Sequence, residues 1–119
     1  MSKSVVKDKS FDFAVRIVKL CRYLREEKKE FVLSKQLVKS GTSIGANISE
    51  AQRGHTKPDF YAKMAIALKE ASETEYWIRL LHATEYINDK EFSSLHSGIN
   101  ELISLLVSIC NSNNKTQTN

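Results

Sequence analysis

The sequence predicts an all-α protein: an elongated, antiparallel four-helix bundle with up-down-up-down topology. Apolar residues recur every three or four positions in four separate segments, the spacing that places them on one face of a helix. The breaks between these segments are short, and short connections join helices that lie antiparallel to each other. The 119 residues include only four Gly and one Pro, which disfavours a turn-rich β-fold.

The first predicted helix covers residues 10–27, with Ser10 as its N-cap. Residues 1–9 are expected to form a flexible, basic N-terminus that precedes the bundle domain of residues 10–110. The apolar face of this helix is formed by Phe11, Ala14, Ile17, Val18, Cys21 and Leu24.

The second predicted helix covers residues 34–53, with Ser34 as its N-cap and Gly54 as a left-handed C-terminal cap. It is rich in small residues, including Gly41 and Gly45, and a glycine inside a helix costs ~1 kcal/mol relative to Ala. We therefore expect another helix to approach closely here, within the bundle and between copies of the chain. The residues expected in helix packing and oligomer contacts are Ser40, Gly41, Ser43, Ile44, Gly45, Asn47 and Glu50, together with Glu73 and Trp77 of the third helix.

The third predicted helix covers residues 57–86, with Thr56 as N-cap and with Pro58 and Asp59 in its first turn. A helix of about thirty residues, rising ~1.5 Å per residue, requires an elongated bundle. The fourth begins after Asn88 and ends near residue 110, before an expected disordered polar tail of residues 111–119. Its apolar seam alternates spacings of three and four: Phe92, Leu95, Ile99, Leu102, Leu106 and Ile109.

Positive charge is concentrated in the first third of the chain. Residues 1–40 contain 11 Lys and Arg against 5 Asp and Glu, a net charge of +6, whereas residues 41–119 contain 7 against 9, a net charge of −2. One interpretation is a solvated helix face, and the other is a basic surface that attracts phosphate backbones or an acidic protein. The candidate nucleic-acid-binding residues are Lys9, Arg16, Lys19, Arg22, Arg25, Lys28 and Lys29.

No pattern in the sequence indicates a catalytic or metal site, and we expect a protein without enzymatic activity, metal or cofactor. A di-metal centre in a helical bundle requires Glu-x-x-His pairs on two helices, and the sequence contains only the reversed spacing, His82 before Glu85. Phosphate-binding glycine loops lie between a strand and a helix, whereas Gly41 and Gly45 lie inside a predicted helix.

Polar residues crowd the middle of the second and third predicted helices. Buried carboxylates require partners, and Arg53, Lys69 and Arg79 are available nearby in the sequence. Two interpretations remain open: a hydrogen-bonded polar layer between helices or subunits, and a ligand pocket. The residues concerned are Asn47, Glu50, Glu70, Glu73 and Glu75.

The two cysteines, Cys21 and Cys110, lie in apolar periodic stretches and are expected to be buried as small apolar residues. They give no disulfide framework, and no apolar run approaches the ~18 residues of a membrane span. We therefore expect a cytoplasmic protein with no membrane association.

Two segments resemble a known bacterial family. Residues 36–51 read QLVKSGTSIGANISEA, and residues 59–77 read DFYAKMAIALKEASETEYW. Both, in this order and separation, are similar to the bacterial four helix bundle protein family, whose founding members are encoded in intervening sequences of large-subunit ribosomal RNA genes. The chain departs from many members at Ala51, where they have Gly.

The resemblance implies a ring-shaped homo-oligomer, typically a pentamer. It also implies kinship with the accessory proteins of diversity-generating retroelements, basic pentamers that bind a reverse transcriptase and nucleic acid. In one functional hypothesis, the chain binds nucleic acid, structured RNA above all, through a basic face of its first helix, and repetition around the ring adds avidity. In the alternative, it is a scaffold that recruits a partner enzyme such as a reverse transcriptase.

Overall fold

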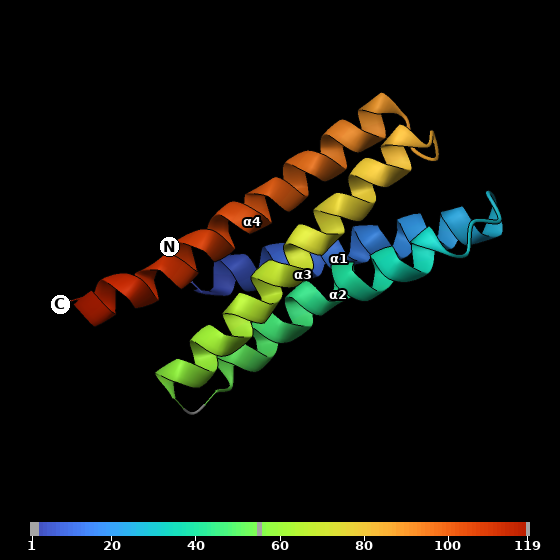
Figure 1. The fold of residues 1–119 in the computed structure, drawn as a ribbon. Coiled ribbons are helices and arrows are strands. Elements are labelled where there is room, and N and C mark those ends of the chain that lie inside the picture. The colour runs from blue at the N-terminus through green and yellow to red at the C-terminus, as the bar shows by residue number, and fades with distance from the viewer. Residues whose placement is uncertain (1–2, 55, 119) are drawn as a thin grey trace.

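The computed structural model describes residues 3–54 and 56–118, which form four α-helices. They are α1 (Lys3–Glu26), α2 (Leu33–Gln52), α3 (Lys57–Ala83) and α4 (Asp89–Thr118). The helices run alternately up and down (Figure 1), and the molecule measures 51 × 23 × 20 Å along its principal axes. The predicted fold class, an elongated all-α four-helix bundle, is confirmed.

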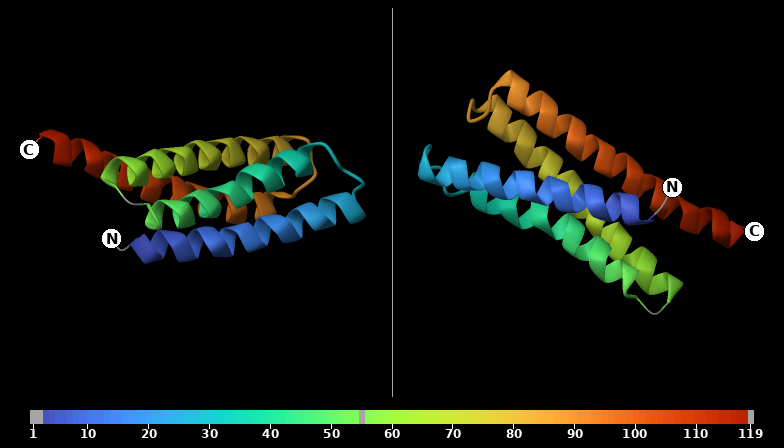
Figure 2. Two further views of the ribbon diagram at one scale, coloured as in Figure 1. Left: turned by 90° about the horizontal axis from the view of Figure 1, so that it is seen from below. Right: turned by 180° about the vertical axis from the view of Figure 1, so that it is seen from behind.

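The four helices do not pack equally against one another. The consecutive pairs α1–α2, α2–α3 and α3–α4 pack along their lengths, whereas α1 and α4 make few contacts with each other. Side chains connect α1 and α4 where Lys9 pairs with Glu101 and Arg16 bonds to Ser94. In the right-hand view of Figure 2, the two helices lie further apart at the end where α1 stops and α4 begins. A groove lies between the C-terminal half of α1 and the N-terminal half of α4.

The core follows the predicted apolar stripes except on α1, where the predicted Phe11 and Val18 are exposed and Phe13 is buried in the core instead. On α4, Leu95, Ile99, Leu102 and Leu106 are buried, and Phe92 and Ile109 pack against the core at its edges. The other helices contribute most of the fully buried large side chains, namely Ile17, Leu24, Leu37, Ile44, Ile48, Met64, Ile78 and Leu81.

The first helix begins earlier than predicted. It starts at Lys3, and Val6 is completely buried, so residues 3–9 belong to the bundle and the prediction of a flexible N-terminus is wrong for them. Ser10 lies inside the helix, where its hydroxyl donates to the carbonyl of Lys7 at 2.8 Å, and it caps nothing. Val6 continues the apolar stripe two turns upstream of Phe13, and burial of its side chain stabilises the added turns. Residues 1–2 lie outside the described residues.

The second helix is capped by a residue that the sequence did not indicate. The carboxylate of Glu30 accepts hydrogen bonds from the backbone N–H groups of Val32, Leu33 and Ser34, at 2.7 to 3.1 Å. The Ser34 hydroxyl donates instead to the carbonyl of Glu30, so the predicted Ser34 cap is wrong. Lys29, with φ of 55°, makes the turn that brings Glu30 back over the helix.

The carboxylate of Glu30 is held in its ionised form. Burial raises its pKa, but the backbone N–H bonds from Leu33, Ser34 and Val32 and the Ser34 side chain outweigh burial, so the pKa lies below its usual value. An ionised carboxylate also suits the positive end of the α2 dipole.

The close helix contact predicted for α2 is confirmed, and α1 is the helix that approaches. A Cβ placed on Gly41 would lie 2.8 Å from Cγ2 of Ile17, and a Cβ on Gly45 would lie 3.2 Å from Oγ of Ser10. Gly54 does not take the predicted left-handed conformation. Its N–H donates to the carbonyl of Ala51 at 3.1 Å, so α2 ends in a tightened turn.

The caps predicted for α3 and α4 are confirmed. The Thr56 hydroxyl accepts from the N–H of Asp59. Asn88 and Glu91 form a reciprocal capping box, in which each side-chain oxygen accepts the other's backbone N–H at 2.8 and 2.9 Å. The ends differ from the prediction: α3 stops at Ala83, and α4 continues to Thr118.

The structure gives residues 111–118 as a continuation of α4, where the sequence predicted a disordered tail. This stretch contains neither Gly nor Pro, so nothing in it interrupts the backbone hydrogen bonds of α4. Residue 119 lies outside the described residues. Among the described helices, none combines the length and apolar character needed to cross a membrane.

Candidate functional site

The basic residues of α1 do not form one face, contrary to the prediction. Lys9 is ion-paired with Glu101 of α4 at 3.2 Å, and the ammonium of Lys28 lies 5.9 Å from the ring centre of Tyr23. The remaining five separate to two sides of α1, and one of them, Lys29, lies beyond the end of this helix at Glu26. Arg16 and Lys19 face α4, whereas Arg22, Arg25 and Lys29 line a hollow beside α2.

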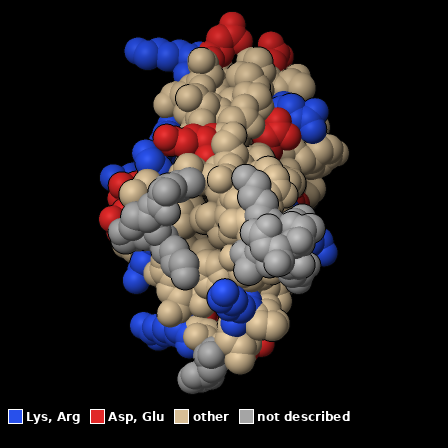
Figure 3. All heavy atoms as spheres, turned by 90° about the vertical axis from the view of Figure 1, so that its left-hand side faces the viewer, with Lys and Arg blue, Asp and Glu red and all other residues tan. Residues whose placement is uncertain are grey.

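Charge at the end of the bundle that holds both termini is mixed. Figure 3 shows Lys and Arg side chains interspersed there with Asp and Glu around an uncharged surface. Positive charge is also neutralised along α1, where Lys9 pairs with Glu101. Further along α1, Lys19, Arg22 and Arg25 form no ion pair within the described part of the chain.

The first cationic site, which we call the α1/α4 groove, lies where α1 and α4 diverge. It is an open hollow of about 520 Å³. The Arg16 guanidinium is fixed across it, since Nη2 donates to Oγ of Ser94 at 2.7 Å. Its lining consists of Arg16, Lys19, Leu20 and Tyr23 from α1 with Lys90, Glu91, Ser94 and Leu95 from α4.

Lys90 is the residue of this groove that sequence reasoning missed. It lies in the first turn of α4, far in sequence from the basic segment of residues 1–40. Only the closure of the bundle, which makes the first and last helices neighbours, places it opposite Lys19. In the sequence, only the predicted bundle topology, and no local motif, could have indicated that Lys90 lies near the first helix.

A second surface, which we call the α1/α2 face, runs along the outer side of these two helices. It contains two hollows, of about 620 Å³ near the start of α1 and about 550 Å³ near its end. Phe11 and Phe31 are exposed there to 67% and 55%, which is unusual for large aromatic residues. Its apolar members are Phe11, Ala14, Val18, Phe31, Val38 and Ala46.

A third surface, the α3 ridge, points away from the bundle. Ile66 and Tyr76 are exposed to 42% and 49%, and Ala62 is exposed on the same side. Trp77 is half-buried beside them, and its indole N–H donates to the carboxylate of Glu73 at 3.4 Å. The α3 ridge is thus a second exposed strip with apolar residues, on a different helix from the α1/α2 face.

The small residues predicted for packing in α2 divide between the core and the surface. Ser40, Gly41 and Ile44 are buried, and Oγ of Ser40 accepts from the Thr74 hydroxyl at 2.8 Å. Ser43, Gly45 and Asn47 are half-buried. The side chains of Ser43 and Asn47 bond to backbone carbonyls of their own helix, and Glu50 pairs with Lys63 at 3.1 Å.

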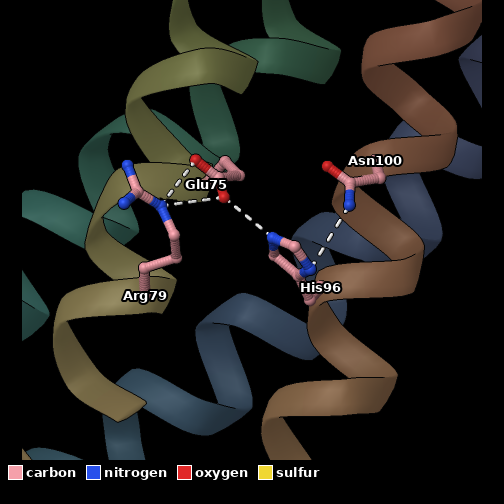
Figure 4. A network of polar contacts seen from close by, with 4 residues as sticks. All are labelled: Glu75, Arg79, His96 and Asn100. Atoms are coloured by element: carbon pink, nitrogen blue, oxygen red, sulfur yellow. Dashed lines mark hydrogen bonds and ion pairs between the residues drawn. The ribbon is translucent and has the colours of Figure 1, made fainter. Parts of the chain in front are cut away.

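The five polar residues that suggested a polar layer or a ligand pocket do not come together. The pair buried between α2 and α3 is Ser40 with Thr74. Glu75 points instead toward α4, where its carboxylate accepts from Nε2 of His96 at 2.8 Å and pairs with Arg79 at 3.0 Å. Figure 4 shows this network, in which Asn100 contacts the other ring nitrogen of His96.

The network ties α3 to α4. Burial raises the pKa of Glu75, but hydrogen bonds from His96 and Arg79 and their charges outweigh burial and lower it overall. The Phe92 ring stacks between His82 and His96, with ring centres 4.1 and 4.7 Å apart. These aromatic and polar contacts are structural links between the last two helices.

Metal binding finds no support in the part of the chain that the structure describes, since no three His, Cys, Asp or Glu side chains are grouped there as ligands. Cys21 is buried, as predicted, and burial raises the pKa of its thiol to about 12. Cys110 is half-buried, and burial raises its pKa as well. Neither thiol is activated as a nucleophile by a lowered pKa.

The fold and surfaces define the class of protein: a small all-α bundle that has exposed apolar surfaces and a first helix with basic side chains on two of its sides. The family described as 23S rRNA-intervening sequence protein matches residues 2–108, and the chain belongs to this family. It is also similar to a crystal structure, at 1.70 Å resolution, of a protein of unknown function from the S23 ribosomal protein family of Bacteroides thetaiotaomicron VPI-5482. The two are 54% identical, with a TM-score of 0.91 over 93% of this chain and 99% of the other. A search of curated proteins found no match.

Proposed function

We propose that this protein is a non-catalytic, ring-forming homo-oligomer, a pentamer, that binds nucleic acid, above all structured RNA, through basic side chains of α1. The observation that carries the proposal is the set of exposed cations past the first two turns of α1. Among the described residues, Lys19, Arg22 and Arg25 have no ion-pair partner. Unpaired surface cations at this density attract phosphate backbones.

Oligomerisation is supported by the two exposed apolar strips. The α1/α2 face and the α3 ridge are different surfaces, and contact between different surfaces of successive copies closes into a ring when the rotation permits. Five copies would carry five sets of α1 cations, and multivalent contact raises affinity well beyond that of one copy.

A salt titration tests nucleic-acid binding. The family description refers to intervening sequences of 23S ribosomal RNA, so labelled fragments of that RNA are the first probe. Their binding is measured by fluorescence anisotropy. The logarithm of the association constant should fall linearly with the logarithm of the salt concentration. The slope should be roughly −0.7 to −0.9 for each phosphate neutralised. Lack of binding at low salt would reject the proposal.

A second candidate function, a scaffold for a partner protein, is favoured by one feature of the α1–α2 connection. Phe31 and Val32 are exposed to 55% and 71%, and Phe31 lines a hollow together with Arg25 and Lys29. Apolar anchors flanked by cations suit a protein partner with an apolar and acidic surface. Affinity capture from the native cell, with and without nuclease, separates the two functions, because a protein partner that survives nuclease treatment favours the scaffold.

A further inference from the structure

We propose that the α1/α4 groove binds an unpaired nucleotide, with the backbone phosphate on Arg16, Lys19 and Lys90 and the base against the apolar floor. This inference rests on the proposed function and narrows it in two ways. It assigns the contact to one of two cationic sites, and it specifies a single-stranded or looped segment in place of a duplex. The floor is formed by Leu20, Tyr23 and Leu95.

The shape of the groove fits one nucleotide. Its volume of about 520 Å³ lies within the ~300–1,000 Å³ typical of sites for small ligands. Leu95 is almost fully buried beneath it, whereas Tyr23 is 40% exposed at its side. Bases stack on aromatic and apolar side chains only when they are unpaired, because pairing and stacking in a helix hide their faces.

The charges of the groove fit one phosphate group or two. Three cations line it against one carboxylate, that of Glu91, and this carboxylate already accepts the backbone N–H of Asn88 in the α4 cap. The Arg16 guanidinium uses Nη2 to hold Ser94, which leaves other N–H donors of the planar group for phosphate oxygens. The groove is thus preorganised for an anion on one side and apolar on the other.

The other cationic hollow is less suited to this role. Arg22, Arg25 and Lys29 adjoin the exposed apolar residues Val18 and Phe31 at the end of the α1/α2 face, so a subunit contact on this face would leave these cations only partly accessible to RNA. The α1/α4 groove shares none of these residues. It would therefore stay open in the assembly.

A matched pair of triple variants tests the assignment. The groove variant carries Arg16→Gln, Lys19→Gln and Lys90→Gln, and the control carries Arg22→Gln, Arg25→Gln and Lys29→Gln, so that both lose the same charge. Binding of a labelled single-stranded oligoribonucleotide and of its fully paired duplex is followed by anisotropy at low salt. We expect the wild type to bind the single strand about tenfold more tightly than the duplex. This ratio corresponds to the binding contribution of one base stacked on the protein.

The groove variant should lose this preference and the control should keep it. Equal losses in both variants, or a loss only in the control, would overturn the inference while leaving the proposed function in place. Failure of the wild type to bind either probe would overturn the proposed function and this inference with it.

A crosslinking measurement on the wild type guards against a variant that fails to fold. A single strand that contains 4-thiouridine is irradiated in complex with the intact protein, and the crosslinked peptide is identified by mass spectrometry. The inference predicts attachment at Lys19, Leu20 or Tyr23 of α1, or within residues 90–95 of α4. Attachment confined to the α1/α2 face would overturn it.

Discussion

The side chain of Ile17 on α1 occupies the space that a side chain on Gly41 of α2 would need. A Cβ at residue 41 would lie 2.8 Å from Cγ2 and 3.1 Å from Cγ1 of Ile17, closer than carbon atoms approach without displacement. Ile17 is completely buried and, as a β-branched residue, has little rotamer freedom. Glycine at 41 is therefore what sets the distance between α1 and α2.

Gly41→Ala should destabilise the protein, although alanine is the better helix former. Overpacking costs ~1–3 kcal/mol, and the gain in helix propensity returns ~1 kcal/mol, so we expect a net loss of up to about 2 kcal/mol. Urea unfolding measures it. Adding Ile17→Ala should relieve the clash, so the double variant should be more stable than additivity predicts. A single variant more stable than the wild type would contradict the described contact.

Glu30→Gln should weaken the start of α2 by ~1 kcal/mol, the usual worth of a cap. Because the pKa of Glu30 is lowered by folding, its contribution is complete above the unfolded-state pKa of about 4.3 and is lost as the pH falls through the lower folded-state pKa. Thermal unfolding from pH 7 to pH 3 should show the difference between wild type and variant shrinking on the acid side. Glu27→Gln, at an exposed acid three residues earlier, is the control and should change little.

Glu75→Gln should loosen the contact between α3 and α4. The variant retains a carbonyl oxygen for His96 but loses the charge that attracts Arg79, so we expect a loss of ~1 kcal/mol near neutral pH. The pKa of Glu75 is lowered, so this contribution also disappears as the pH falls below about 4. Hydrogen exchange of amides in α4 reports the loosening. Equal effects of Glu75→Gln and of Glu70→Gln, whose carboxylate is outside the network, would show that the network contributes nothing.

Phe11→Glu should break the proposed ring without unfolding the chain, since Phe11 is 67% exposed on the α1/α2 face. A charge buried at a subunit contact is strongly unfavourable, so sedimentation should show smaller species with unchanged helix content by circular dichroism. Val107→Glu is the matched control, an apolar residue 39% exposed on α4, outside both strips. An oligomer unaffected by Phe11→Glu would exclude the α1/α2 face as the contact.

Local sequence signals predicted most of the fold. The periodic stripes gave four helices, and Thr56 and Asn88 were recognisable as caps because their side chains act on residues three positions ahead. The sequence did not predict the Glu30 cap, because this cap depends on a positive φ at Lys29 and a lysine does not indicate such a turn. The start at Lys3 escaped because the stripe upstream of Ser10 contains one large buried residue, Val6.

The candidate site was less accessible to prediction. Charge counting located the basic segment but treated Arg16 and Arg25 as parts of one face, although nine residues of helix rotate them to different sides. The groove also depends on Lys90 and Ser94, which only the closure of the bundle brings to α1. Ion pairs between helices, such as the pair of Lys9 with Glu101, likewise depend on the tertiary fold and cannot be read from local sequence.

The most direct test of the central claim is the mass of the wild-type particle in solution, measured by multi-angle light scattering after size exclusion. Both the ring and the avidity of its α1 cations require several copies of the 13.5 kDa chain. We predict a single species with about five times that mass, because the family resemblance implies a pentamer and a closed ring has one defined size. A monomer of 13.5 kDa at micromolar concentration would contradict the account.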